Sequence, residues 1–120
     1  MGFQSDYLLR LIEMMGVLLQ RIMGRVAEGE PAEAVELAND AIGELTGLPV
    51  STVDAMDGPG LVAFLSAGGE LAPDIARALA ALLSARAGAR DDLGETATAN
   101  ADRDRAQALV VAADSGDRPN

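Results

Sequence analysis

Residues 7 to 26 read YLLRLIEMMGVLLQRIMGRV, and a stretch this apolar must be covered by something other than water. At about 100° per residue, most of its large apolar side chains share one broad helical face: Leu8, Leu11, Ile12, Met15, Leu18, Leu19, Ile22, Met23 and Val26. Leu9 and Met14 widen that face on opposite sides. The stretch therefore predicts a long helix, from just after Ser5 to about Val26, that contacts more than one neighbour.

A membrane is one possible cover, because about 20 mostly apolar residues are enough to span a bilayer as a helix. However, polar and ionised side chains gather on one stripe of this helix, as expected for an edge in water: Arg10, Glu13, Gln20, Arg21 and Arg25. The charges that begin at Asp6 also come too early for a signal peptide. We therefore expect a cytoplasmic protein that makes no membrane contact and whose first helix is covered by protein.

The next two segments continue the helical pattern. The run EGEPAEAVELANDAIGELTGLP predicts a helix that begins at Pro31 and is closed by Gly47. The short connection before it predicts an antiparallel hairpin with the first helix. Residues 50–69 predict a buried connector of two short helices, in which the STVD at 51–54 resembles a capping box and Pro59 starts the second helix.

The last third of the chain is rich in alanine. Pro73 begins a long helix that ends between positions 87 and 97 and points four large side chains inward: Ile75, Leu79, Leu82 and Leu83. Because TATAN is poor helix material, we expect the final helix only from about Ala101 to Ala113. The prediction is a single α-helical domain over residues 1–113 and a disordered tail over 114–120.

The residue inventory excludes many chemistries. The chain has no Cys, His, Lys or Trp, and all nine basic residues are arginine. Disulfides, thiolate nucleophiles, Schiff bases and the usual general base are therefore absent, and so is the commonest metal ligand. Two acidic groups lack the spacing of a calcium loop and are expected to be solvated: Glu28, Glu30 and Glu33, and Asp91, Asp92 and Glu95. We predict no catalytic residue, no metal and no cofactor, with a carboxylate-based hydrolase as the most distant alternative.

The net charge of −10 disfavours anionic partners, because it repels phosphate backbones and anionic lipid surfaces. We therefore expect no nucleic-acid partner.

A spacing of the form small–x–x–Leu–x–x–x–small occurs twice, 72 positions apart: Ala34, Leu37 and Ala41, and again Ala106, Leu109 and Ala113. Small residues two turns apart let a neighbouring helix approach closely. Together with Gly29, the first copy resembles the second helix of a tetratricopeptide unit. The expected fold is therefore all-α, with tetratricopeptide-like antiparallel helix hairpins and short helices in the middle connector.

A wider resemblance covers nearly the whole chain. DYLLRLIEMMGVLLQRI, then a G-x-x-x-E-A helix ending in GLP, then GGELAPD opening a long helix, is similar to a bacterial domain-of-unknown-function family. Its members are small helical proteins with tetratricopeptide-like patterning. The signature Asp-Tyr-x-x-Arg-x-Ile-Glu stands at Asp6, Tyr7, Arg10, Ile12 and Glu13. The resemblance implies the fold and carries no activity.

Two functions are compatible with these features. The first is a non-enzymatic protein–protein interaction module, a helical adaptor whose groove takes a peptide or helix. The alternative is a homodimeric structural subunit assembled through the apolar first helix. In both cases the partner is protein, and the expected contact residues are Tyr7, Leu9, Arg10, Met14, Val17 and Arg21. Because Leu9 and Met14 lie on opposite edges of the apolar face, we expect one to face the core and the other a partner.

Overall fold

The structure is a computed structural model that describes residues 3–69 and 71–117. Six helices follow one another along the chain: α1 (Phe3–Ala27), α2 (Pro31–Thr46), α3 (Val50–Asp54), α4 (Gly58–Leu65), α5 (Pro73–Asp92) and α6 (Thr96–Asp117). No strand occurs in the described ranges, so the all-α prediction is confirmed. Within these ranges, no helix is long and apolar enough to cross a membrane.

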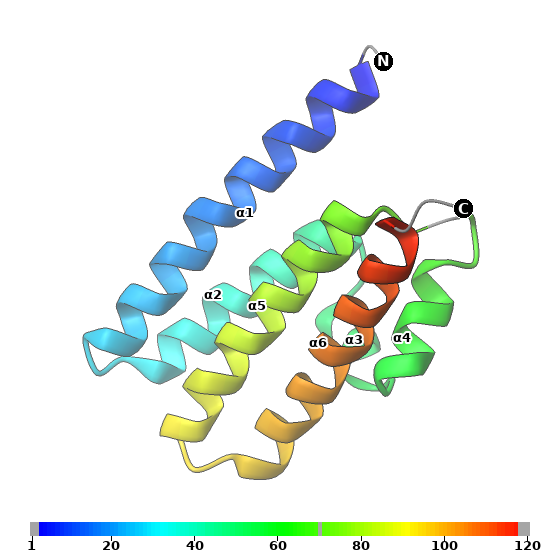
Figure 1. The fold of residues 1–120 in the computed structure, drawn as a ribbon. Helices are drawn as coiled ribbons and strands as arrows, with labels where there is room; N and C mark the ends of the chain where they lie inside the picture. The colour runs from blue at the N-terminus through cyan, green and yellow to red at the C-terminus, as the bar shows by residue number, and fades with distance from the viewer. Residues whose placement is uncertain (1–2, 70, 118–120) are drawn as a thin grey trace.

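The long helices form two successive hairpins, α1 with α2 and α5 with α6 (Figure 1). α5 packs against α1, α2 and α6, and the short α4 covers α6. The N-terminal half of α1 projects beyond the other helices (Figure 1). The molecule is correspondingly elongated, with extents of 43 × 27 × 25 Å.

Both hairpins turn at a glycine. Gly29 and Gly94 have φ angles of 79° and 78°, a region that glycine enters without steric cost. In each turn the next residue's backbone N–H reaches back five residues, from Glu30 to the oxygen of Arg25 and from Glu95 to that of Arg90, both at 2.8 Å. These bonds satisfy carbonyl groups at the helix end.

α2 has the predicted bounds. Pro31 occupies the start of the helix, and Gly47 closes it with a φ of 72° and an N–H bond to the oxygen of Gly43. Three alanines are buried on its inward face, Ala34, Ala38 and Ala41, each at 1% exposure or less. The alanines of both predicted close-packing seams are buried, including those at 106 and 113 on α6.

The connector forms two short helices as predicted, but two details of the prediction are wrong. α3 begins at Val50, and no side chain caps it, so Ser51 is not the predicted cap. The capping carboxylate belongs instead to Asp57, which accepts a 2.7 Å hydrogen bond from the N–H of Gly60 at the start of α4. Phe64 is 51% exposed, so the connector is only partly buried.

α6 begins at Thr96, five residues before the predicted start, and continues to Asp117. The weak helix formers of TATAN are helical because Ala99 among them packs in the interior, and tertiary packing outweighs a small difference in propensity. Residues 114–117 of the predicted disordered tail are helical, and 118–120 lie outside the described residues.

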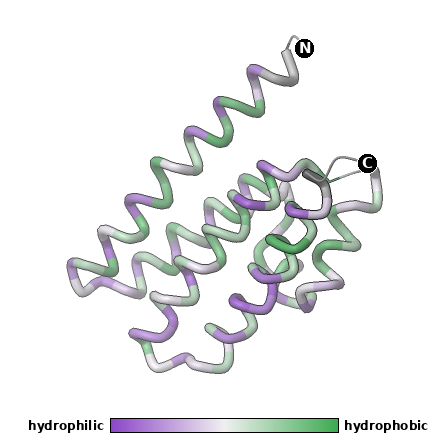
Figure 2. Tube along the Cα trace, viewed as in Figure 1, coloured by the Kyte–Doolittle hydropathy of each residue, from purple (hydrophilic) through white to green (hydrophobic). Residues whose placement is uncertain are grey.

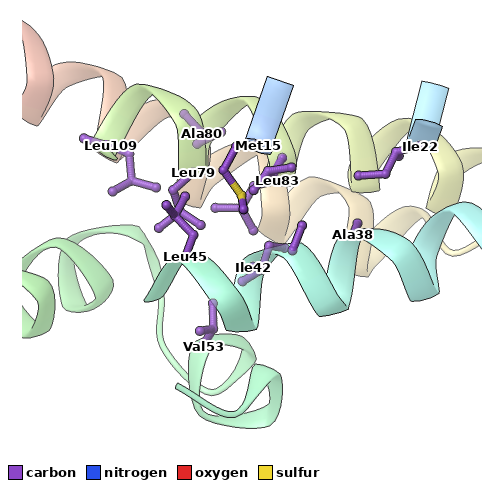
Figure 3. Packing of buried hydrophobic residues seen from close by; sticks show 14 of the residues in the cluster. Met15, Ile22, Ala38, Ile42, Leu45, Val53, Leu79, Ala80, Leu83 and Leu109 are labelled. Atoms are coloured by element: carbon purple, nitrogen blue, oxygen red, sulfur yellow. The ribbon is translucent and has the colours of Figure 1, made fainter. Parts of the chain in front are cut away.

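The core lies where α1, α2, α5 and α6 meet. Figure 3 shows Met15, Ile42, Leu45 and Leu79 converging from three of these helices, and each is buried. Two side chains predicted to face inward from α1 are exposed instead, Leu8 at 39% and Met23 at 59%. The first helix is therefore covered along only part of its apolar arc.

Candidate functional site

All six residues predicted to contact a partner are exposed on α1. Five of them follow one another alternately three and four residues apart, so they form one outward stripe: Tyr7, Arg10, Met14, Val17 and Arg21. We call this row the outer stripe. Leu9 lies apart from it, on the side of α1 that faces α5.

Neither Leu9 nor Met14 faces the core. Their side chains are 62% and 46% exposed, so the expectation that one of the two would be intramolecular is wrong. The reason is the projection of α1: residues 6–10 are exposed on every side, and the first buried side chain is that of Leu11. Figure 2 shows apolar residues continuing along α1 beyond the point where it leaves the bundle.

A groove runs between α1 and α5. Its larger hollow, of about 370 Å³, is lined by Leu8, Leu9, Ile12, Ala72, Pro73, Asp74 and Ile75. A smaller hollow of about 150 Å³ shares Ile12 and is lined further by Met15, Gly16, Leu19, Ala78, Ala81 and Leu82. We call the two together the α1–α5 groove. Except for one aspartate, its lining is apolar.

The charges on α1 differ from those of the rest of the chain. This helix has three arginines and two carboxylates, whereas the whole chain has a net charge of −10. Arg25 pairs with Glu28 at 3.1 Å and with Glu33 at 3.2 Å. Arg10 and Glu13 are both described, and they do not form an ion pair although they lie three residues apart on α1.

A second constellation lies inside the protein, at the junction of α3, α5 and α6. The carboxylate of Asp102 is fully buried and accepts four hydrogen bonds from three guanidinium groups. Arg86 donates two of them, from Nε at 2.9 Å and Nη2 at 2.6 Å. Arg90 and Arg105 donate the others, at 2.9 and 2.8 Å. This bidentate arrangement with two further donors occupies both carboxylate oxygens.

Arg86 is also fully buried and has other partners. Its Nη1 donates to Oδ1 of Asn39 on α2 at 2.8 Å, and its Nη2 donates to Oδ1 of Asp54 on α3 at 2.6 Å. Burial by itself lowers the pKa of Arg86, but the hydrogen bonds and charges of Asp102 and Asp54 outweigh it and hold the pKa above its ordinary value. The guanidinium is therefore permanently charged.

Arg105 ties the same cluster to the backbone. Its Nε donates to the carbonyl oxygen of Met56, and its Nη2 donates to that of Asp54, both at 2.8 Å. The buried arginine cluster, defined as Arg86, Arg90 and Arg105 with Asp54 and Asp102, therefore joins α3, α5, α6 and the turn before α4. Three positive and two negative charges leave it with an excess of +1.

This cluster is arranged for stability and not for acid–base chemistry. Its guanidinium groups do not deprotonate in proteins, and the buried carboxylate of Asp102 has no free oxygen lone pair directed at solvent. Of its two carboxylates only that of Asp54 reaches water, at 32% exposure. The adjoining hollow of about 230 Å³ is lined by Asp54, Ala55, Met56, Asp57, Ala101, Asp104 and Arg105, and it contains no hydroxyl or thiol.

The two acidic groups considered as metal sites are partly engaged by arginine. Arg25 pairs with Glu28 and Glu33, and Arg103 pairs with Asp91. Across the described part of the chain, no three acidic, His or Cys side chains are placed to hold a metal ion.

Sequence reasoning missed the buried arginine cluster, although a signal was present. Along α5, Leu79, Leu83, Arg86 and Arg90 follow each other at helical spacing, which places the two arginines on the same face as the leucines. On α6, Asp102 stands seven residues before the buried Leu109. Charged residues at inward positions of two adjacent helices indicate a buried ion network.

Comparisons with protein-family models, with curated proteins and with solved structures found no match to this chain. The resemblance to a bacterial family of tetratricopeptide-like proteins therefore stays a prediction.

Proposed function

We propose that the chain is a non-enzymatic protein–protein interaction module whose contact surface is α1. One observation carries the proposal: of the ten large apolar side chains that are exposed among the described residues, six belong to this helix, namely Tyr7, Leu8, Leu9, Met14, Val17 and Met23. Single exposed apolar residues are normal on a monomer, whereas their concentration on one helix supports a role of that helix in an interaction.

The arrangement of the helices supports an adaptor. Two hairpins follow in series, α1–α2 and α5–α6, and each closes through a glycine turn of the same kind. Between α1 and α5, which open the two hairpins, lies the α1–α5 groove. A helix or peptide laid in such a groove is a common mode of recognition. In this proposal the two hairpins and their groove act as in a tetratricopeptide-like protein.

A homodimeric structural subunit is the second candidate, because the same exposed residues of α1 could meet those of another copy. Catalysis is disfavoured by the composition, since the chain has no His, Cys or Lys. The carboxylate hydrolase is weakened further because the two neighbouring carboxylates, Asp54 and Asp102, are both bonded to arginine.

Photo-crosslinking tests the proposal. A photoreactive amino acid replaces Leu9 on the groove side or Met14 on the outer stripe, and the protein is irradiated in the cells that naturally make it. Val111 on α6 is the matched control, because it is 54% exposed and lies away from α1. We expect discrete crosslinked products from at least one α1 position and none from position 111. Equal labelling at all three positions, or none at any, contradicts an α1 contact surface.

A further inference from the structure

Small residues line part of the α1–α5 groove, beside the buried Met15 and Leu82. These small residues are Ala78 and Ala81 of α5 and Gly16 of α1, and a Cβ added at Gly16 would meet nothing within 4 Å. Large apolar side chains that are less buried also line the groove, including Leu9 and Leu19. Such a surface accommodates bulky side chains from a partner and lets a helix backbone approach closely.

The rim of the groove is acidic. Asp74 lines it from α5, and its side chain is 84% exposed, with Arg77 at 4.0 Å. On α1, Asp6 and Glu13 are both exposed. Asp6 lies three residues before Leu9 and Glu13 lies four residues after it, so both stand beside Leu9 on the same side of the helix. Arg10 and Arg21 lie about 100° or more around α1 from Leu9, away from the groove.

We propose that the α1–α5 groove binds an amphipathic helix with a basic flank from another protein. This inference rests on the proposed interaction function and specifies its partner. The apolar lining selects bulky apolar side chains on one face of the helix, and the acidic rim selects Lys or Arg beside that face. A second copy of this chain fits less well, because an antiparallel α1 in the groove would bring two acidic rims together.

The groove also determines the length of the bound helix. The lining residues of α1 run from Leu8 to Leu19, which corresponds to about 17 Å of helix at 1.5 Å per residue. A partner helix of about three turns covers this length. Its apolar residues recur at positions i, i+3, i+4 and i+7, and its basic residues stand beside them.

Two synthetic peptides provide the probe for the full chain. The basic peptide has about 14 residues, with leucines at helical spacing and lysines at the other exposed positions. The acidic peptide is identical except that glutamate replaces every lysine. Fluorescence anisotropy measures the Kd of each. We expect the basic peptide to bind at least about tenfold more tightly, with an affinity that falls as salt is added.

Variants locate the bound peptide. Gly16→Leu adds a large side chain to the groove lining, and it should weaken binding of the basic peptide at least about tenfold while preserving the fold, because leucine is a better helix former than glycine. Gly24→Leu is the matched control on the same helix, where an added Cβ also meets nothing within 4 Å. Glu13→Lys and Asp74→Lys should each weaken binding about threefold or more.

The outcomes separate this inference from the proposed function. Equal binding of the two peptides, or equal effects of Gly16→Leu and Gly24→Leu, overturns the groove as a site for a basic helix. A chain that binds neither peptide but forms a dimer, which Gly16→Leu dissociates, shows that the groove holds a second copy. That result overturns the basic helix and leaves the interaction function intact. Failure of the crosslinking experiment at both α1 positions removes the interaction function itself.

Discussion

The carboxylate of Asp102 on α6 meets the guanidinium of Arg86 on α5 with nitrogen–oxygen distances of 2.6 and 2.9 Å, and neither side chain is exposed. The pair lies between the two helices of the second hairpin. Arg86 also bonds to Asn39 on α2, so one side chain links the two hairpins. Because the two buried charges compensate each other, removing one of them leaves the other unpaired and costs more than the net contribution of the pair.

Asp102→Asn should destabilise the protein strongly. The substitution leaves the guanidinium groups of Arg86, Arg90 and Arg105 around a neutral amide, and breaking a buried ion pair costs about 3–5 kcal/mol. Urea unfolding followed by circular dichroism measures the loss. Asp104→Asn on the exposed side of α6 is the control. A loss below about 1 kcal/mol for Asp102→Asn would show that the cluster does not clamp the hairpins.

Arg86→Lys should destabilise the protein and make its stability depend on alkaline pH. Lysine cannot reproduce the planar fork that reaches Asp102, Asp54 and Asn39 together, and the lost bonds cost about 1–3 kcal/mol at neutral pH. The folded-state pKa of Arg86 is raised, so its contribution is fully present below the unfolded-state pKa and is lost only as pH rises through the folded-state value.

A lysine paired at position 86 would also lose its stabilising contribution as pH rises. The loss would begin at a lower pH than for arginine, because the unperturbed pKa of lysine is about 10.4. The difference in unfolding free energy between the wild type and Arg86→Lys should therefore widen above about pH 10. A difference that stays constant up to pH 11 would contradict this assignment.

Gly58→Ala should be destabilising because α4 and α6 approach closely at this glycine. A Cβ there would lie 2.7 Å from the backbone oxygen of Asp104 and 2.8 Å from the Cβ of Ala108, so the helices would have to separate. We expect a loss of about 1–3 kcal/mol in urea unfolding. Gly88→Ala is the matched control inside α5, where a Cβ meets nothing, and it should gain up to about 1 kcal/mol. If Gly58→Ala is as stable as Gly88→Ala, the α4–α6 contact is looser than described.

Ala41→Leu tests the close packing of the first hairpin. Ala41 is 1% exposed on the inner face of α2, so a larger side chain should overpack the core at a cost of about 1–3 kcal/mol. Ala106→Leu should cost less, because its side chain is slightly more exposed, at 6%. Ala32→Leu on the exposed face of α2 serves as the control. Chemical denaturation without loss for Ala41→Leu would remove this packing.

Leu9→Glu and Met14→Glu should both remain folded, because both side chains are exposed. Their unfolding free energies should change by no more than about 0.5 kcal/mol, as for ordinary surface substitutions. The two should differ in partner binding, since only Leu9 lines the α1–α5 groove. Thermal unfolding and peptide anisotropy on the same samples separate these effects. Loss of cooperative unfolding in either variant would mean that α1 is packed more deeply than the structure shows.

Local chemistry in the sequence was enough to determine several elements of this fold. Pro31 and Gly47 delimit α2 because a proline tolerates the first helical turn and a glycine accepts the left-handed cap. The alanine spacing at 34 and 41 identified a buried seam, because periodicity of 3.6 residues places those positions on one face. The same periodicity placed Arg10 and Arg21 on the stripe that faces water, and both are exposed.

Tertiary structure alone decided the rest. Thr96 begins α6 and Ala99 is buried because packing against neighbouring helices outweighs local propensities of a few tenths of a kcal/mol. Arg86 is buried only because α3 and α6 bring Asp54 and Asp102 to it from residues far away in the chain. An arginine in a helix is usually exposed to water. Its burial requires compensating charges, and here these charges come from other helices, so the sequence of α5 does not reveal them.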